Sequence, residues 1–422
     1  MNKARAPRSA CLTAMMCPQR RREAYRFRAP AALALALAVA LTLAVSEVAR
    51  AELPRAVGRA FLENGVPLNR VAIVVQETGK PQPLFTLDPD RAMNPASVMK
   101  LVTTFAALEL LGRDYRWKTE AYLGGRLVNG TLRGDLILKG YGDPKITLEQ
   151  WQAFMATLRA AGLKRIDGDL ALDRSFFALP THDSALFDGE PLKPYNVGPD
   201  ALLVNFKSVR FVFAPDSASG GVKVVAEPAL PGVALGPPPA LAGVDCGDWR
   251  GALGAHFANQ PEQAQVSFDG RFAASCGERE WWVALLDAPH YVHAIFTALY
   301  RDAGGQFAGG LKERRAPRGA EPFATLESPP LYDIVRDVNK LSNNVMARQI
   351  FLTLATTSAP PPATPAKASE AVKRWLQSRK LAVPGLVLEN GSGLSRNERI
   401  TARGLARLLL AADASESRDE FA

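Results

Sequence analysis

The chain of 422 residues is too long for one ordinary core, and its composition, 47% apolar and 22% charged, is that of a globular protein with two or more domains. Its formal net charge of +9 has the sign expected of a protein that binds nucleic acid. Residues 1–51, however, hold nine basic and two acidic residues, which leaves +2 for residues 52–422. Because residues 52–422 are so close to neutral, they have no evident phosphate-binding surface, and nucleic acid is not an expected partner.

The N-terminus has the three parts of an export signal. Basic residues gather in Arg20–Arg28, Ala31–Val45 is a run of 15 residues without charge, and Ala49-Arg50-Ala51 has the A-x-A pattern of a cleavage site. We therefore expect cleavage after Ala51 and a periplasmic mature protein without a stable membrane span. The apolar run is shorter than the roughly 20 residues that a membrane-spanning helix needs. An uncleaved N-terminal anchor is the alternative.

Two of the four cysteines would leave with this signal. Cys246 and Cys276 stay, and an even pair in an exported chain favours a disulfide, with two separate thiols as the alternative. No C-x-x-C or His/Cys cluster indicates a metal site. His290 and His293 form an H-x-x-H pair without a third ligand of evident type, which we interpret as coincidence.

After the signal, Val71–Gln76 predicts a buried strand, with Pro83–Leu87 as its partner. Apolar residues then recur at helical spacing over Val98–Leu111, between a proline that suits a first turn and a glycine that suits an end. Ser97 therefore lies at the start of an expected amphipathic helix.

Residues 116–320 show short β-like runs between Gly and Pro turns, interrupted by one expected helix at Leu148–Ala161. The runs are Leu136–Leu138, Leu170–Leu172, Val209–Phe213 and Val222–Val225. This pattern predicts a β-rich insertion of one or two subdomains. Helices are expected again from Leu331 and over Asn344–Leu354, Ser369–Arg379 and Ala402–Ala411, with a flexible surface loop at Thr356–Lys367.

The stretch Ser97-Val98-Met99-Lys100 is the only S-x-x-K in the chain. On a helix, positions i and i+3 share a face, so the hydroxyl and the amine can touch. A serine hydroxyl is a poor nucleophile until a nearby base takes its proton, and a lysine can be that base if burial lowers its pKa. Taken alone, the motif fits equally a serine near a helix start and a solvated lysine.

The second element is Ser342-Asn343-Asn344, an S-x-N between two helical stretches. The Ser342 hydroxyl could relay a proton to a leaving amine, and the Asn344 amide could hold a peptide group of a substrate. Helix capping by serine and asparagine is the simpler alternative for these residues.

The spacing of the two motifs, about 245 residues, resembles that of the class C low-molecular-mass penicillin-binding proteins. These are D-alanyl-D-alanine carboxypeptidase/endopeptidases of the S13, or penicillin-binding-protein-4, type. The resemblance covers residues 55–420. It extends to the stretches Gly140–Pro144, Asp167–Leu170, Tyr195-Asn196, Ser328–Leu331, Asn339–Asn344 and Gly391–Arg396.

The resemblance implies an α/β (α+β) fold of the serine DD-peptidase/β-lactamase type with a large β-rich insertion. Residues 52–115 and 322–422 would form the peptidase domain and residues 116–321 the insertion, after a signal peptide at residues 1–51.

The resemblance also implies the chemistry. Ser97 would attack the carbonyl of the penultimate D-alanine of a peptidoglycan stem peptide and form an acyl-enzyme. Lys100 would be the base, with Ser342 and Asn344 on the opposite wall. β-Lactams would acylate Ser97 as substrate mimics. No metal or organic cofactor is implied, and a homo-oligomer is left open.

One departure concerns the third motif of the family, K-T-G, which this sequence lacks, since Lys118-Thr119 is followed by Glu120. The resemblance therefore implies that the C-terminal strands of the peptidase domain are missing and that activity is impaired. Two other functions stay open. One is a non-catalytic peptidoglycan-binding or scaffold protein, and the other is a β-lactamase on the same fold, which the long insertion disfavours.

Overall fold

The computed structural model describes residues 53–216 and 218–421. The expected export signal and its cleavage after Ala51 lie outside the described residues. Glu52–Ala422 form one compact unit. Across the described ranges, no helix combines the length and the apolar character that crossing a membrane requires.

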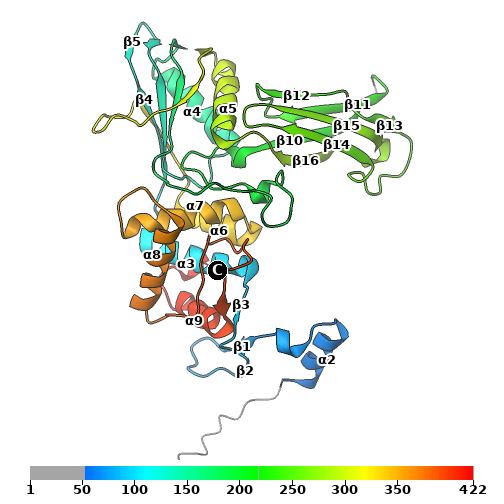
Figure 1. Ribbon diagram of the computed structural model, residues 1–422, viewed down its shortest axis with the longest axis vertical. Helices are drawn as coiled ribbons and strands as arrows, with labels where there is room; N and C mark the ends of the chain where they lie inside the picture. The colour runs from blue at the N-terminus through cyan, green and yellow to red at the C-terminus, as the bar shows by residue number, and fades with distance from the viewer. Residues whose placement is uncertain (1–52, 217, 422) are drawn as a thin grey trace, which may run out of the picture. The chain divides into compact units, whose positions relative to one another are not determined.

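Helix α3 (Met99–Leu111) is the centre of a helical cluster, drawn in cyan and in orange to red in Figure 1. The other helices of this cluster are α6 (Leu331–Leu341), α7 (Asn344–Leu354), α8 (Pro365–Ser378), α9 (Ala402–Asp413) and α10 (Arg418–Phe421). All five contact α3, and α10 does so through the Phe421 ring, whose centroid lies 5.4 Å from that of Phe105. As a result, Met99, Val102 and Phe105 of α3 are at most 1% exposed.

The expectation that this segment is an amphipathic helix is wrong in one respect. The helix is present, but its polar side is covered as well, and Thr103 and Thr104 are fully buried. Their hydroxyls donate to the backbone carbonyls of Gly391 and Lys100, at 2.7 and 2.8 Å. Because these hydroxyls are satisfied, the neighbouring helices can enclose α3 without leaving a polar group unpaired.

A small sheet and a helix precede α3. Strands β1 (Ile73–Val75) and β2 (Phe85–Leu87) pair antiparallel, as expected, after helix α2 (Arg55–Glu63). Strand β3 (Ala92–Met93) pairs with β20 (Ile400–Thr401). The predicted burial of the first strand is wrong, since Val75 is 46% exposed. Helix α9 packs against β1, and a two-stranded sheet covered on one side leaves the other side to solvent.

Two mixed sheets lie at the top of Figure 1. Their strand orders are β18-β9-β7-β4-β19 and β17-β8-β6-β5. The strands are β4 (Lys118–Leu123), β5 (Arg126–Val128), β6 (Thr131–Arg133), β7 (Leu136–Gly140), β8 (Arg165–Ile166), β9 (Leu170–Asp173), β17 (Gln306–Phe307), β18 (Leu311–Glu313) and β19 (Ala324–Glu327). Helix α4 (Leu148–Ala160) begins with a capping box between Thr147 and Gln150 and buries Trp151 against these strands.

Helix α5 (Ala288–Asp302) was not expected from the sequence, where one helix was assigned to the β-rich region. Its start carries a recognisable signal, because the Asp287 carboxylate accepts the His290 N–H and Pro289 lies in the first turn. Its buried side is also periodic, with Tyr291 and Ile295 fully buried. The repeated β-like runs on both sides concealed this pattern.

The remaining strands form a sandwich, drawn in green on the right of Figure 1. One sheet has the order β11-β10-β16, and the other has β12-β15-β13 with β14 also paired to β15. The strands are β10 (Ser208–Asp216), β11 (Gly221–Glu227), β12 (Val233–Leu235), β13 (Ala240–Ala242), β14 (Leu253–Asn259), β15 (Ala264–Ala273) and β16 (Arg279–Ala284). Phe213 joins the sheets by packing edge-on against Phe268 at 4.8 Å between ring centroids.

The segment expected to be a flexible loop, Thr356–Lys367, is shorter and better anchored than predicted. Helix α8 begins at Pro365, where the Thr364 side chain accepts the Lys367 N–H. Ala363 is 1% exposed, and its backbone exchanges hydrogen bonds with Phe176 and Ala178. Its Pro-rich composition predicted mobility, but this contact fixes its end.

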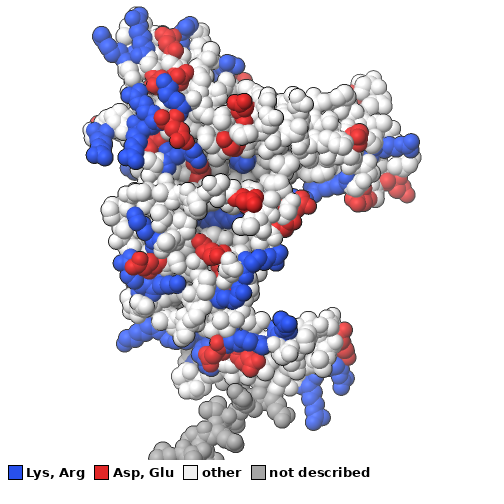
Figure 2. All heavy atoms as spheres, in the orientation of Figure 1, with Lys and Arg blue, Asp and Glu red and all other residues white. Residues whose placement is uncertain are grey.

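Most buried side chains belong to two large clusters. One is formed by α3 and α6 to α9, and the other extends from Ala121 to Phe307. The division into a peptidase domain (residues 52–115 and 322–422) and an insertion (residues 116–321) stays a prediction. On the face drawn in Figure 2, basic and acidic side chains are interspersed, and the β10–β16 sandwich carries few charges.

Candidate functional site

Ser97 lies in the short 3₁₀ turn Ala96–Val98 that leads into α3, and it is exposed. The residue before it, Ala96, has a φ of +46°, a conformation that costs energy for a residue with a side chain. Asn94 holds this turn, because its Oδ1 accepts the Ala96 N–H at 2.9 Å and its Nδ2 donates to the Ser395 carbonyl at 2.7 Å. The strained turn thus places Ser97 at the N-terminal end of helix α3.

Lys100 lies one turn later and is 2% exposed. Its Nζ donates to Ser97 Oγ at 3.2 Å, to Asn344 Oδ1 at 2.6 Å and to the Ser392 carbonyl at 2.7 Å. Three acceptors are the number that an ammonium group can use. The i, i+3 spacing of the S-x-x-K therefore does bring the hydroxyl and the amine together, and Asn344 joins them.

The electrostatic surroundings of Lys100 weaken its hold on a proton. Burial, and after it the positive charge of Arg348, lower the pKa of Lys100 to about 8, while the Glu398 carboxylate acts in the opposite direction. A lysine with such a pKa is present as the neutral amine far more often near neutral pH than an exposed lysine.

The two polar residues of the S-x-N motif are placed differently. Ser342 ends α6 in a left-handed conformation, with a φ of 53°, and is exposed. Within the part of the chain that the structure describes, no hydrogen bond joins its hydroxyl to Ser97 or Lys100. Asn344 is buried, and its Nδ2 donates to the Tyr195 carbonyl at 3.3 Å. Capping of α7, the simpler alternative for this motif, is performed by Asn343.

A glycine-containing loop supplies the third acceptor of Lys100. Gly393 has a φ of +81°, and a Cβ there would lie 1.7 Å from the Ala96 carbonyl oxygen. Gly391, with a φ of +70°, would meet Thr103 Oγ1 at 2.7 Å. Only glycine allows this approach, which brings the backbone of Ser392 onto Lys100.

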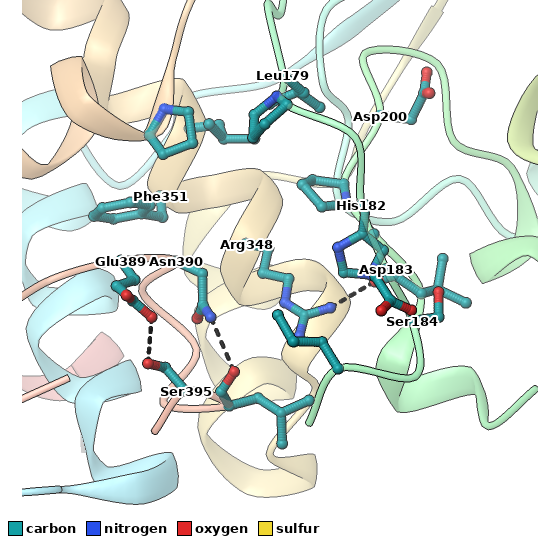
Figure 3. A pocket seen from close by; sticks show the side chains of 18 of the residues that line it. Leu179, His182, Asp183, Ser184, Asp200, Arg348, Phe351, Glu389, Asn390 and Ser395 are labelled. Atoms are coloured by element: carbon teal, nitrogen blue, oxygen red, sulfur yellow. Dashed lines mark hydrogen bonds between the residues drawn. The ribbon is translucent and has the colours of Figure 1, made fainter. Parts of the chain in front are cut away.

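Glu398 holds this loop in place. Its Oε1 accepts the backbone N–H groups of Glu389, Asn390 and Gly391, each at 3.0 Å, and the side chain is fully buried. Figure 3 shows two further bonds of the same loop, from Ser395 to Glu389 and from Asn390 to the Leu394 carbonyl. Glu398 was not among the expected site residues, because nothing in the sequence separates a buried acid from an exposed one.

Arg348 was also missed. It lies on α7 one turn after Asn344, is 5% exposed, and its Nη1 donates to the Val197 carbonyl at 2.7 Å. The helical spacing of α7 placed Arg348 on the side of Asn344, but an arginine in such a position is usually exposed.

The two histidines of the H-x-x-H pair form hydrogen bonds with different partners. His290 Nδ1 bonds to the Asp287 carboxylate at 2.7 Å, and His293 Nε2 bonds to the Gly309 carbonyl at 3.0 Å. Among the described residues, no group of three or more His, Cys, Asp or Glu side chains is arranged to hold a metal ion.

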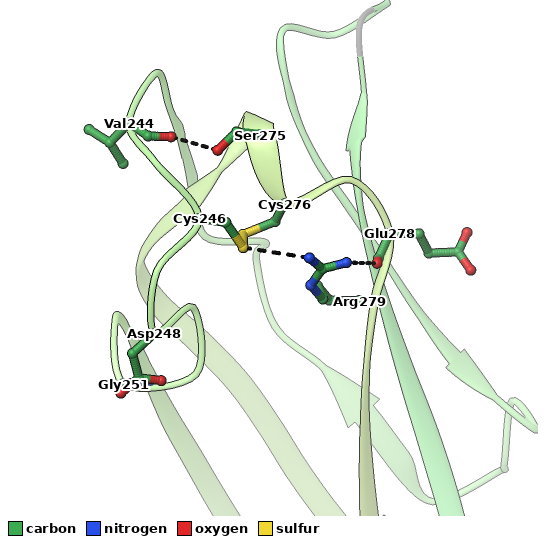
Figure 4. The surroundings of a disulfide bond; sticks show 8 residues. All are labelled: Val244, Cys246, Asp248, Gly251, Ser275, Cys276, Glu278 and Arg279. Carbon is green, nitrogen blue, oxygen red and sulfur yellow. Dashed lines mark hydrogen bonds between the residues drawn. A yellow bond between two sulfur atoms is a disulfide. The ribbon is translucent and has the colours of Figure 1, made fainter.

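Cys246 and Cys276 form a disulfide in the β10–β16 sandwich (Figure 4). It ties the segment after β13 to the turn after β15. The neighbouring Ser275 hydroxyl donates to the Val244 carbonyl at 2.8 Å and closes the same turn. Neither cysteine touches Ser97 or Lys100, so the disulfide belongs to the framework of the sandwich.

The sequence model of the D-Ala-D-Ala carboxypeptidase 3 (S13) family matches residues 56–422. The chain belongs to this family. The family resemblance drawn from the two motifs is thereby confirmed.

Two curated relatives are similar over most of the chain. D-alanyl-D-alanine carboxypeptidase DacB of Haemophilus influenzae is 25% identical over 329 residues, or 75% of this chain and 65% of that protein. D-alanyl-D-alanine carboxypeptidase of Actinomadura sp. (strain R39) is 26% identical over 349 residues, or 80% of this chain and 63% of that protein. The chain thus spans a little less than two thirds of the length of these relatives.

The crystal structure of penicillin binding protein 4 (dacB) from Haemophilus influenzae matches with a TM-score of 0.69 at 24% identity, over 86% of this chain and 79% of that chain. A structure of the same protein complexed with a novel β-lactam has a TM-score of 0.66. These likenesses confirm the expected fold, an α/β serine-peptidase fold with a large insertion.

The loop that Glu398 holds yields a test by mutation. Glu398→Ala would leave three N–H groups without their acceptor, of which that of Gly391 is buried and would cost about 1–3 kcal/mol, and the two partly buried ones less. Glu398→Gln keeps an acceptor oxygen, so we expect it to lose less than half as much stability in urea unfolding followed by circular dichroism. Glu370→Ala, an exposed site on α8, is the control and should change little. Equal losses for the Ala and Gln variants at position 398 would contradict the assigned role.

Proposed function

We propose that this chain is a serine D-Ala-D-Ala carboxypeptidase/endopeptidase that acts on peptidoglycan stem peptides through an acyl-enzyme on Ser97. The observation that carries the proposal is the hydrogen-bonded set of Ser97, Lys100 and Asn344, in which a buried amine meets an exposed hydroxyl. The family of the chain and the names of its relatives support it, since both describe D-alanyl-D-alanine carboxypeptidases.

The proposed reaction begins with neutral Lys100, which takes the proton of the Ser97 hydroxyl as Oγ bonds to the carbonyl carbon of the penultimate D-alanine. The peptide C–N bond then breaks, and the leaving amine receives a proton from Lys100, with the Ser342 hydroxyl as relay. The Asn344 amide would hold the substrate's peptide group. Water next attacks the Ser97 ester and gives a proton to Lys100, which passes it to Ser97 Oγ as the C–O bond breaks. The shortened peptide leaves as a carboxylic acid, which ionises at neutral pH, and Ser97 and neutral Lys100 are restored.

β-Lactams would enter the same path, because their ring amide presents a carbonyl to Ser97 in the way that the peptide does. The complex of the Haemophilus influenzae protein with a β-lactam supports this part of the proposal. Peptidoglycan lies outside the cytoplasmic membrane, so we also propose that the protein acts in the periplasm after export by residues 1–51.

A fluorescent penicillin provides the direct test of the nucleophile. The purified chain should carry one covalent label, and Ser97→Ala should abolish it, because Ser97 Oγ is the hydroxyl oxygen that the Lys100 amine contacts. Ser358→Ala removes an exposed serine outside the site and serves as the control that keeps the label.

Labelling that persists in Ser97→Ala would refute the nucleophile. A folded wild-type chain that takes no label would favour a non-catalytic, peptidoglycan-binding role, and rapid release of the label would favour a β-lactamase.

The pH dependence of acylation follows from Lys100. Only its neutral form can accept the Ser97 proton, so the rate should rise with pH, reach half its maximum near the pKa of about 8, and level off above it. Stopped-flow acylation between pH 6 and pH 10 measures this. A rate that is flat from pH 6 to pH 9 would contradict Lys100 as the base, and Lys100→Gln should remove the dependence together with most of the rate.

A further inference from the structure

A cavity of about 1370 Å³ lies beside the Ser97 site, between α7, the chain at residues 179–200 and the loop at residues 388–397. Ser97, Lys100, Ser342 and Asn344 are not part of its wall. Figure 3 shows Arg348 extending from α7 toward the segment that carries His182 and Asp183. The cavity therefore belongs to a region that the proposed acyl-transfer chemistry does not use.

Arg348 is a buried cation whose hydrogen-bonding capacity is mostly unused. A guanidinium has five N–H donors, and the described residues supply one acceptor, the Val197 carbonyl. No carboxylate of the described residues lies within ion-pair distance of it. Burial lowers the pKa of Arg348 to about 10, so the group is cationic at neutral pH. The Glu398 carboxylate stabilises this cation electrostatically, but it accepts none of its N–H groups, and a bound anion would supply the missing acceptors.

Two further basic side chains lie on the same wall. Lys207 comes from the turn before β10, and its Nζ donates to the Leu286 carbonyl at 2.6 Å. His182 Nε2 bonds to the Asn196 carbonyl at 2.7 Å. Burial lowers the pKa of His182, and the positive charges of Arg348 and Lys207 act in the same direction, whereas the hydrogen bond to Asn196 and the Asp183 carboxylate act in the opposite one. His182 therefore lies within electrostatic reach of both cations.

Five acidic side chains also line the wall, and none of them forms an ion pair with Arg348 or Lys207, because each has another partner. These pairs are Asp183 with the Ala185 N–H, Asp200 with Arg174, Asp287 with His290, Glu370 with Arg374, and Glu389 with Ser395. Two of their charges still act on the basic groups, Asp183 on His182 and Asp287 on Lys207. Arg348 is thus left without an ion-pair partner among the described residues, although the wall as a whole carries charges of both signs.

We propose that this cavity is an anion-binding site in which Arg348, assisted by Lys207, receives a carboxylate group of a ligand. The planar fork of a guanidinium matches a carboxylate, with two parallel N–H···O bonds. The volume admits a ligand much larger than a single ion. The carboxylate has two conceivable sources, a free small dicarboxylate or a side chain of a peptide, and the same Arg348 would bind either.

Glutarate is the probe for the free anion. Titration calorimetry on the folded chain should show saturable binding that sodium chloride at equal ionic strength does not reproduce. Losing a charge-assisted hydrogen bond costs enough that Arg348→Gln should weaken this binding roughly tenfold to hundredfold, and Lys207→Gln by a smaller factor. Arg126→Gln, an exposed arginine on β5, is the matched control and should bind glutarate like the unaltered chain.

Arg348→Lys, which keeps the charge without the fork, covers the case in which Arg348→Gln does not fold, and it should still bind more weakly. Two peptides then separate the sources, both tested on Ser97→Ala so that no acylation intervenes. One carries a side-chain carboxylate and the other its amide. A preference for the free acid that depends on Arg348 assigns the site to peptides, and equal binding of the two peptides assigns it to free anions.

Absence of saturable glutarate binding, or binding that is the same in the Arg348 and Lys207 variants, would overturn the proposal. Since calorimetry on these variants does not involve acylation of Ser97, its failure is distinct from a failure of the proposed peptidase function.

Discussion

The burial of the Lys100 ammonium group is the constraint on which the rest of the site depends. A lysine is costly to bury unless each of its donors meets an acceptor, and here the acceptors come from three separate parts of the chain. Ser97 lies on the same turn, whereas Asn344 and Ser392 are 244 and 292 positions away. The amine can therefore be buried only when α3, α7 and the loop at residues 391–393 have all assembled.

Each of these three segments has a local feature that brings it into contact with Lys100. The turn at Ala96 accepts backbone strain, α7 is capped by Asn343 so that the next residue points inward, and two glycines let the loop lie against α3. Two buried charges then act on the amine from opposite sides. Burial is the largest cause that favours the neutral amine, Arg348 adds to it and Glu398 opposes it, and the result leaves Lys100 able to accept a proton near neutral pH.

Local pattern was enough to predict much of this arrangement. The i, i+3 spacing of Ser97 and Lys100 follows from helix geometry, and α7 has the bounds, Asn344–Leu354, that its apolar spacing predicted. The errors arose where distant segments decide burial. Helix α3 is enclosed on its polar side by α6 to α9, and the end of the Pro-rich segment is fixed by a contact with residues 176–178.

The residues that sequence reasoning missed share one property. Glu398 and Arg348 have charges that are common on protein surfaces, and only tertiary contacts show that both are buried beside Lys100. The sequence showed the pairing of Ser97 with Lys100, but it did not show that Arg348 and Glu398 act on the pKa of Lys100.

The central claim, that this burial makes Lys100 a base, can be tested most directly by titrating the residue itself. The ¹³Cε resonance of Lys100, assigned by comparison with Lys100→Arg in a ¹³C-lysine-labelled chain, reports its protonation between pH 6 and pH 11. A midpoint near 8 is the predicted result. A midpoint at the ordinary lysine value of about 10.4 would contradict the account, because the amine would then be protonated under the conditions in which it has to act.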